Sequence, residues 1–237
     1  MCRLILASGR FDTRAIINAA VAMGEGRTAD HESPFRCHPN GWGAVWRQAG
    51  APHGLALHRD PSTLSSERAR ACGAWDTETD FLAVHVRHAT VPRNAGLEFT
   101  HPLERHGQAG PWYFMHNGYL PTVHTLLGLT ESRFDSAEYF DYVVDARRDT
   151  LDPGATLAKL RAIPPGGSSG NAIAVSPRRA YLLHYTPATT PYPRYFNMRR
   201  LMGPGFCVFA SEIIPSLAPA ERWETLPPEQ VIEVPLS

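Results

Sequence analysis

The chain has 237 residues, a length typical of one large domain or of two small ones, and its formal net charge is zero because 23 Lys and Arg side chains balance 23 Asp and Glu. Without a basic excess, the sequence argues against binding to nucleic acid or to anionic lipid. No apolar run approaches the roughly 18 residues of a membrane span, and Arg10, Asp12 and Arg14 interrupt any secretory signal. We therefore expect one domain over residues 1–237, located in the cytoplasm, with no membrane or nucleic-acid partner.

The cysteines are consistent with the reducing conditions of the cytoplasm, and the histidine spacing bears on metal binding. The four cysteines are Cys2, Cys37, Cys72 and Cys207. They do not share metal-ligand spacing, and a chain of this size does not need disulfides, so reduced thiols are the simplest interpretation. The 11 histidines include no His-x-x-x-His arrangement, and the chain has no Cys-x-x-Cys, so we expect no bound metal.

Residues 1–110 are predicted to form four strands and a helix. The helix is indicated over 13–23, where Ile16, Ile17, Ala20 and Val21 recur at helical spacing. Buried or alternating apolar runs predict the strands, over 2–7, 42–46, 54–58 and 81–88.

The rest of the chain adds helices and more strands. Asp135 and Ser136 are good N-caps for a helix over 136–147, and a second helix over 155–163 ends at Pro164. The segment 186–205 carries prolines and predicts a surface loop able to cover a site. Strands are predicted over 112–116, 171–175, 180–185, 206–211 and 231–234, with a short helix near 121–127. Many strands with few helices favour an α+β layered domain.

Cys2 opens the first predicted strand. An initiator methionine before a small residue is normally trimmed, which would leave a thiol and a free α-amino group on this residue. The amine has a pKa of about 7.7–8.0, so part of it is unprotonated near neutral pH and can take the thiol proton. Cys2 would then be a nucleophile that carries its own base. The alternative is a small buried residue without a chemical role.

Three polar clusters can be related to Cys2. Arg87, three residues before Thr90, offers a planar fork to a carboxylate, or else forms an ordinary surface salt bridge. The Asn117 amide and the Gly118 N–H can both donate to one oxygen, as an oxyanion hole requires, or else form a plain turn. Asp135 either caps a helix or holds a substrate ammonium group.

A fourth cluster precedes the second predicted strand. It reads His-Pro-Asn-Gly-Trp-Gly over 38–43. The glycines allow a tight turn into a strand near the site, and the alternative is an ordinary loop.

Together these clusters resemble the class II glutamine amidotransferases, which are N-terminal nucleophile (Ntn) hydrolases. The matching segments follow the family's order over most of the chain: Met1-Cys2, 38–43, 87–90, 100–102, 112–118, 135–138 and 209–212. The Thr-His-Pro at 100–102 is similar to a small stand-alone branch, related to γ-glutamyl amidohydrolases of ergothioneine synthesis and glutathione breakdown. Synthase-type members have His-Gly where this chain has Val91-Pro92, which puts free glutamine in question as the substrate.

The resemblance implies a four-layer αββα fold with two stacked antiparallel sheets. It implies that Cys2 attacks the γ-amide of glutamine or of a γ-glutamyl compound and forms a thioester that water hydrolyses, without a cofactor. Arg87 and Thr90 would hold the substrate α-carboxylate and Asp135 its α-ammonium group. Asn117 and the Gly118 N–H would stabilise the oxyanion.

Two alternatives remain at this point. The chain would be a glutaminase subunit that passes ammonia to a separate synthase, or a non-catalytic sensor that binds a γ-glutamyl metabolite. The leaving group cannot be named from the motifs. The segments 105–110 and 186–205 are expected to border its side of the pocket.

Overall fold

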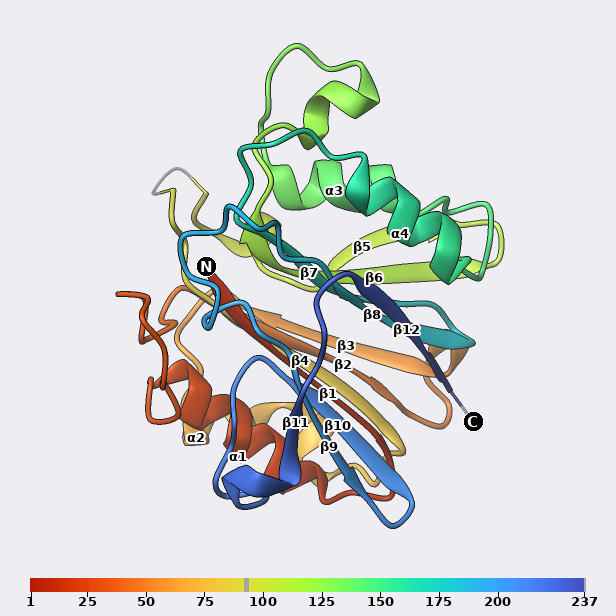
Figure 1. Cartoon of the computed structure of the whole chain (residues 1–237). Coiled ribbons are helices and arrows are strands. Elements are labelled where there is room, and N and C mark those ends of the chain that lie inside the picture. Colours follow the sequence, from red (N-terminus) through yellow and green to blue (C-terminus); the bar gives the residue numbers. More distant parts are fainter. Residues whose placement is uncertain (92–93, 237) are drawn as a thin grey trace.

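A computed structural model describes residues 1–91 and 94–236 of the chain. Two antiparallel sheets are stacked face to face, and helices cover both outer faces (Figure 1). The predicted four-layer αββα architecture is therefore confirmed.

Each sheet combines strands from distant parts of the sequence. The larger sheet contains β1 (Cys2–Gly9), β2 (Trp42–Arg47), β3 (Leu55–Asp60), β4 (Phe81–Arg87), β9 (Arg199–Gly203), β10 (Phe206–Ala210) and β11 (Trp223–Thr225), in the order β11-β9-β10-β1-β4-β2-β3. The smaller sheet contains β5 (Leu103–Gly107), β6 (Gly110–Tyr119), β7 (Ser169–Val175), β8 (Arg179–His184) and β12 (Gln230–Pro235), in the order β12-β8-β7-β6-β5.

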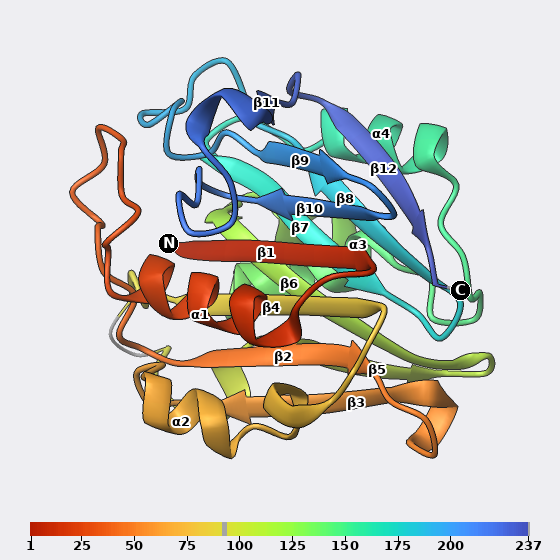
Figure 2. The same ribbon diagram turned by 90° about the horizontal axis from the view of Figure 1, so that it is seen from below.

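The helices form the outer layers. Below the larger sheet lie α1 (Thr13–Gly24) and α2 (Ser66–Ala71), and above the smaller sheet lie α3 (Asp135–Val143) and α4 (Pro153–Arg161) (Figures 1 and 2). Among the described residues, no helix is long and apolar enough to cross a membrane.

Strand β1 occupies the middle of the larger sheet, between β4 and β10 (Figure 2). All its residues from Cys2 to Ala7 are buried, because both faces of the strand are covered. Ile5 and Ala7 belong to the core under α1, whereas Leu4 and Leu6 belong to the core between the sheets. A strand covered on both sides reads as a continuous apolar run, which explains the sequence signal.

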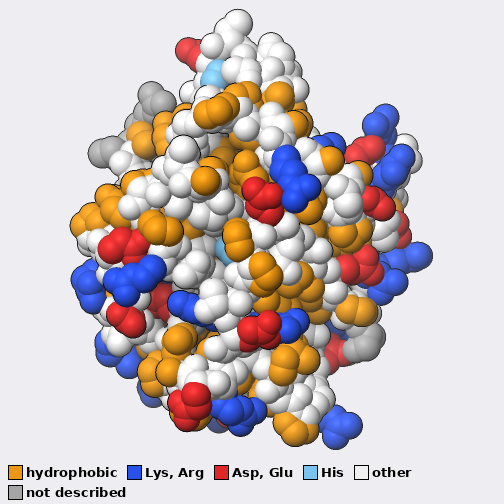
Figure 3. Space-filling model, viewed as in Figure 1, with side chains coloured by type: hydrophobic (Ala, Val, Ile, Leu, Met, Phe, Trp, Pro, Cys, Tyr) orange, Lys and Arg blue, Asp and Glu red, His pale blue; other side chains and the backbone are white. Residues whose placement is uncertain are grey.

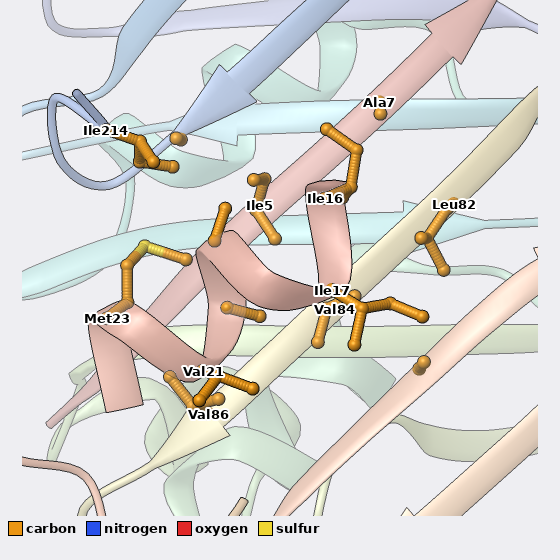
Figure 4. Packing of buried hydrophobic residues seen from close by; sticks show 14 of the residues in the cluster. Ile5, Ala7, Ile16, Ile17, Val21, Met23, Leu82, Val84, Val86 and Ile214 are labelled. Carbon is orange, nitrogen blue, oxygen red and sulfur yellow. The ribbon is translucent and has the colours of Figure 1, made fainter. Parts of the chain in front are cut away.

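The core under α1 fixes the layer that carries β1. Ile16 and Ile17 of α1 pack against Ile5 and Val84 of the sheet (Figure 4). Asp12 caps α1, since its carboxylate accepts from the N–H groups of the first turn. The nucleophile candidate therefore begins a strand that packing holds in place.

Several elements were not predicted, and they share a polar composition. Strand β5 reads Leu-Glu-Arg-His-Gly and lies at a sheet edge, where charged side chains face solvent. It pairs with β6 as a hairpin, so the segment 105–110 is not a loop. Strands β9 and β11 and the short helix α2 were also missed. Hydrophobic periodicity cannot find elements that bury so few apolar side chains.

Two predicted boundaries were wrong. The segment 186–205 is not all surface loop, because β9 starts at Arg199 and the preceding Tyr195, Phe196 and Met198 are fully buried. Helix α3 begins at Asp135 with Phe134 as its N-cap, and it ends at Val143 rather than at 147.

Candidate active site

The candidate active site lies between the sheets, where β1 begins and where β4 and β6 end (Figure 1). Cys2, the first residue of β1, pairs with Arg87, the last residue of β4. The Cys2 N–H donates to Asn117 Oδ1 of β6 at 2.9 Å. This bond crosses from one sheet to the other, so three of the predicted site residues meet at one point.

The Cys2 thiol is buried, with 6% of the residue exposed. Burial alone would raise its pKa, but the positive α-amino group at the chain start, His85 and Arg87 lower the pKa well below its ordinary value. That amino group belongs to Met1, and it donates to the His88 carbonyl at 2.8 Å. A lowered pKa increases the thiolate fraction near neutral pH, and the thiolate is the nucleophilic form.

Asn117 and Gly118 lie inside β6, paired with Asn171 and Gly170, so the alternative of a plain turn is wrong. Asn117 Nδ2 is buried and has no hydrogen-bond partner among residues 1–91 and 94–236. A buried unpaired donor costs about 1–3 kcal/mol, and it is expected where a ligand or a water supplies the acceptor. A Cβ atom at Gly118 would collide with the Ser169 carbonyl oxygen, so the strand requires glycine there.

The guanidinium of Arg87 is buried beside the thiol. It donates to two backbone carbonyls, Asn94 O at 2.6 Å and Asn40 O at 3.3 Å, and it forms no ion pair among the described residues. Burial lowers the pKa of Arg87, although Cys2 and Asp135 oppose the shift. A buried cation with an incomplete hydrogen-bond set is well suited to an incoming carboxylate.

Asp135 stands in the first turn of α3, with its side chain 11% exposed. Its Oδ2 accepts from the Leu120 N–H at 2.9 Å, and it lies 4.0 Å from His116 Nδ1. The His116 ring also bonds Ser136 Oγ at 2.9 Å and Ser169 O at 3.1 Å. Because His116 links β6 to α3, the carboxylate is held next to the end of β6.

A pocket of about 100 Å³, here called the Cys2 pocket, brings these groups together. Its lining includes Met1, Cys2, Arg87, Thr90, Gly118 and Asp135. Thr90 is exposed, whereas Asn117 is fully buried behind the pocket wall. A cation, a carboxylate and a thiol around one small pocket can hold an amino-acid head group next to a nucleophile.

The segment 38–43 supports the end of β4, as its glycines predicted. Gly41 has a φ of +117°, a conformation that favours glycine, and its carbonyl accepts from the Arg87 N–H at 2.8 Å. The Asn40 N–H donates to Arg87 O at 2.9 Å, and Asn40 Oδ1 accepts from the Ala89 N–H at 3.0 Å. These bonds fix the backbone on both sides of the Arg87 guanidinium.

A sequence model of the family described as glutamine amidotransferases class-II matches residues 1–136, more than half of the chain. The chain belongs to this family. The matched segment contains Cys2, Arg87, Thr90, Asn117, Gly118 and Asp135. No curated protein sequence matches the chain significantly.

Solved structures of amidotransferases share the fold at low identity. The glutamine phosphoribosylpyrophosphate amidotransferase from B. subtilis, complexed with ADP and GMP, is 16% identical with a TM-score of 0.63. The alignment covers 100% of this chain and 49% of that one, so this chain spans about half the length of that enzyme.

Stand-alone proteins also match. A glutamine aminotransferase class-II domain protein from Silicibacter pomeroyi is 15% identical with a TM-score of 0.53, over 100% of both chains. A predicted glutamine amidotransferase from Pseudomonas aeruginosa is 15% identical with a TM-score of 0.50, over 99% of this chain and 95% of that one. At such identities the likeness shows the fold alone.

A buried ion pair beside the candidate site was not identified from the sequence. Arg3 Nε lies 2.5 Å from Glu212 Oε1, and Arg3 Nη1 donates to Tyr195 O at 3.0 Å. The Tyr195 hydroxyl in turn donates to the Cys2 carbonyl at 3.2 Å. The segment 209–212 was noted only for its family resemblance, and the structure shows that Glu212 holds the start of β1.

His85 and Asn171 were also missed. His85 lies two residues before Arg87, and its Nε2 bonds His116 O at 3.1 Å while its ring centroid lies 4.4 Å from that of His101, at a tilted angle. Residues two apart in a strand share a face, so the spacing in β4 was an available signal for His85. Asn171 Nδ2 donates to Phe196 O at 2.6 Å, which ties the loop after β8 to β7.

The outcome for the segment 105–110 is clear. The segment 105–110 was expected to border the pocket, and this is wrong, because His106, Gly107 and Gln108 lie against residues 145–147 instead. Over residues 1–91 and 94–236, no group of three or more His, Cys, Asp or Glu side chains is arranged to hold a metal ion.

Proposed function

We propose that this amidotransferase hydrolyses the γ-amide of glutamine or of another γ-glutamyl compound, with Cys2 as the nucleophile after Met1 is removed. The observation that carries the proposal is the buried Nδ2 of Asn117, which lacks a partner among the described residues, on the side chain whose Oδ1 accepts from the Cys2 N–H at 2.9 Å. An oxyanion formed at the thiol would supply the missing acceptor. The residues 1–237 would act as a single domain.

The Cys2 pocket would bind both charged groups of the glutamyl substrate, the α-carboxylate and the α-ammonium group. Arg87, with Thr90 at the rim, would bind the α-carboxylate, and Asp135 would bind the α-ammonium group. The side-chain amide would then lie against Cys2. Removal of Met1 would also enlarge the pocket, because Met1 is part of its lining.

The reaction would use the Cys2 α-amine as its base. The unprotonated amine, held by Asn117 Oδ1, takes the thiol proton directly or through a water. The sulfur attacks the amide carbon, and Asn117 Nδ2 with the Gly118 N–H stabilises the oxyanion. When the C–N bond breaks, the amine returns the proton to the leaving ammonia or amine. Water then attacks the thioester and releases glutamate and the thiol.

The test compares processed protein with protein that retains Met1 behind an N-terminal tag. The processed protein is expected to release glutamate from γ-glutamyl amides, and Cys2→Ala or a retained Met1 should lower turnover on the order of 10⁴-fold or more. Cys207→Ala, a cysteine on β10, is the matched control and should leave turnover unchanged. Mass spectrometry should detect a γ-glutamyl adduct on Cys2. Normal hydrolysis by tagged protein would falsify the N-terminal nucleophile.

A second candidate is a glutaminase subunit that passes ammonia to a separate synthase. It is supported by the structural likeness to about half of a longer enzyme, the B. subtilis amidotransferase. This candidate predicts low glutaminase activity alone and higher activity when the partner is added. Tight binding of a γ-glutamyl compound without any release of ammonia or amine would instead support a sensor.

A further inference from the structure

An open cavity of about 800 Å³, here called the apolar vestibule, adjoins the Cys2 pocket. The two share Met1, Thr90, Val91 and Tyr119 in their linings, and the last three of these remain common to both once Met1 is removed. The vestibule is several times larger than the Cys2 pocket and falls within the usual size range of ligand sites. A group attached to a substrate bound at Cys2 would therefore extend into it.

The vestibule wall is apolar. Phe35, Pro165 and Pro191 contribute carbon surface, and the polar groups are hydroxyls such as those of Ser168 and Thr189. None of the described lining residues carries a charged side chain. In Figure 3 most charged side chains lie along the right side and in the lower half of the view.

The wall is also anchored to the nucleophile strand. Thr189 and Pro191 come from the loop that follows β8, and Tyr195 and Phe196 of that loop bond Cys2 and Asn171. On the other side, the Phe35 ring lies 4.9 Å from the His88 ring and 6.4 Å from the Tyr192 ring. The vestibule is therefore placed in a fixed position relative to the Cys2 sulfur.

We propose that the substrates are γ-glutamyl amides of apolar amines, aromatic or branched aliphatic, and that the apolar vestibule binds the leaving amine. This inference rests on the proposed function. Ammonia would leave the vestibule unused. A leaving group with its own carboxylate or ammonium group would lose hydration there without gaining a counter-charge from the described lining residues.

The chemistry is that of the proposed hydrolysis. The γ-amide C–N bond breaks, the leaving nitrogen takes the proton held by the Cys2 amine, and a neutral apolar amine is released. Burial of its hydrocarbon part favours binding in proportion to the area removed from water. Selectivity would therefore come from the size and polarity of the amine.

The test uses two amides with closely similar reacting bonds, γ-glutamyl-benzylamide and γ-glutamyl-methylamide, with γ-glutamyl-glycine as the charged comparison. The processed protein should show a kcat/KM for the benzylamide about tenfold or more above the other two, the discrimination typical of an apolar pocket. Phe35→Ala should lower the benzylamide-to-methylamide ratio about tenfold. Leu129→Ala removes an exposed apolar side chain outside both linings and should leave the ratio unchanged.

Binding to Cys2→Ala protein, measured by calorimetry, should show the same preference without turnover. Equal kcat/KM for all three amides, or a Phe35→Ala effect that is equal on both alkylamides, would overturn the vestibule proposal and leave the proposed function standing. Hydrolysis of glutamine alone, stimulated by a synthase, would also overturn it and make the vestibule a docking face. If no γ-glutamyl compound is hydrolysed, both proposals fail.

Discussion

The Cys2 pocket presents a buried cation, a carboxylate and a thiol around about 100 Å³, whereas the adjoining apolar vestibule offers about 800 Å³ with no charged side chain among its described lining residues. The pocket is built at strand ends and is held by buried hydrogen bonds. The vestibule is walled mainly by loops. Loops tolerate sequence change better than strands. The contrast suggests a constant part of the substrate in the pocket and a variable part in the vestibule.

The largest expected effect is the loss of stability when the buried ion pair beside the Cys2 pocket is broken. Glu212→Ala would leave the buried Arg3 without its counter-charge, and we expect a loss of about 3–5 kcal/mol in the free energy of unfolding. Glu224→Ala breaks an exposed pair with Arg200 and should cost about 1 kcal/mol or less. Urea denaturation measures both. A similar small loss for both variants would show that the ion pair does not anchor the start of β1.

The next effect tests whether the Cys2 pocket binds the part of the substrate that all γ-glutamyl amides share. Asp135→Asn keeps an oxygen that can accept from the Leu120 N–H, but it removes the charge proposed to hold the α-ammonium group. A hydrogen bond to a charged group is worth about 1.5–3 kcal/mol, so kcat/KM should fall roughly 10- to 150-fold, equally for every γ-glutamyl amide.

The control for Asp135→Asn lies on the same helix. Asp141 pairs with Arg105 on the surface, and Asp141→Asn should leave kcat/KM unchanged. A fall that depends on the leaving amine would contradict the division between the Cys2 pocket and the apolar vestibule.

The smallest effect is a shift in the pH at which the Cys2 thiol is alkylated. The pKa of Cys2 is lowered, whereas burial raises the pKa of Cys207 to about 11. In protein that retains Met1, alkylation of Cys2 by iodoacetamide should therefore reach half its maximal rate below the pH of about 8.5 expected of a free cysteine. Cys207 should react only in strong alkali. Mass spectrometry at each pH resolves the two sites, and the opposite order would contradict the charge environment described for Cys2.

The sequence located the candidate site residues better than the strands and helices around them. Cys2, Arg87, Gly118 and Asp135 were all named beforehand, and the structure places them around one pocket. They could be named because each occupies a short motif whose residue types the proposed reaction requires. The interpretation of Asp135 as a helix cap was wrong, because its carboxylate accepts from Leu120 instead.

The supporting residues could not be found in that way. Arg3 and Glu212 are 209 positions apart, and each alone reads as an ordinary charged residue. Their pairing exists only because β10 lies beside β1. Edge strands such as β5 were missed for a related reason, since their stability comes from pairing with a neighbour rather than from an apolar run of their own.

By itself, the sequence indicated a layered α+β fold, a candidate nucleophile at the second position and candidate polar partners for it, because those signals are local in the chain. Only the tertiary structure decided which groups are buried, that Asn117 Nδ2 has no partner among the described residues, and what lies beyond Cys2. The apolar vestibule combines Phe35, Tyr119, Pro165 and Pro191 from four separate segments. No local pattern encodes a cavity whose walls meet only when the two sheets and their loops pack together.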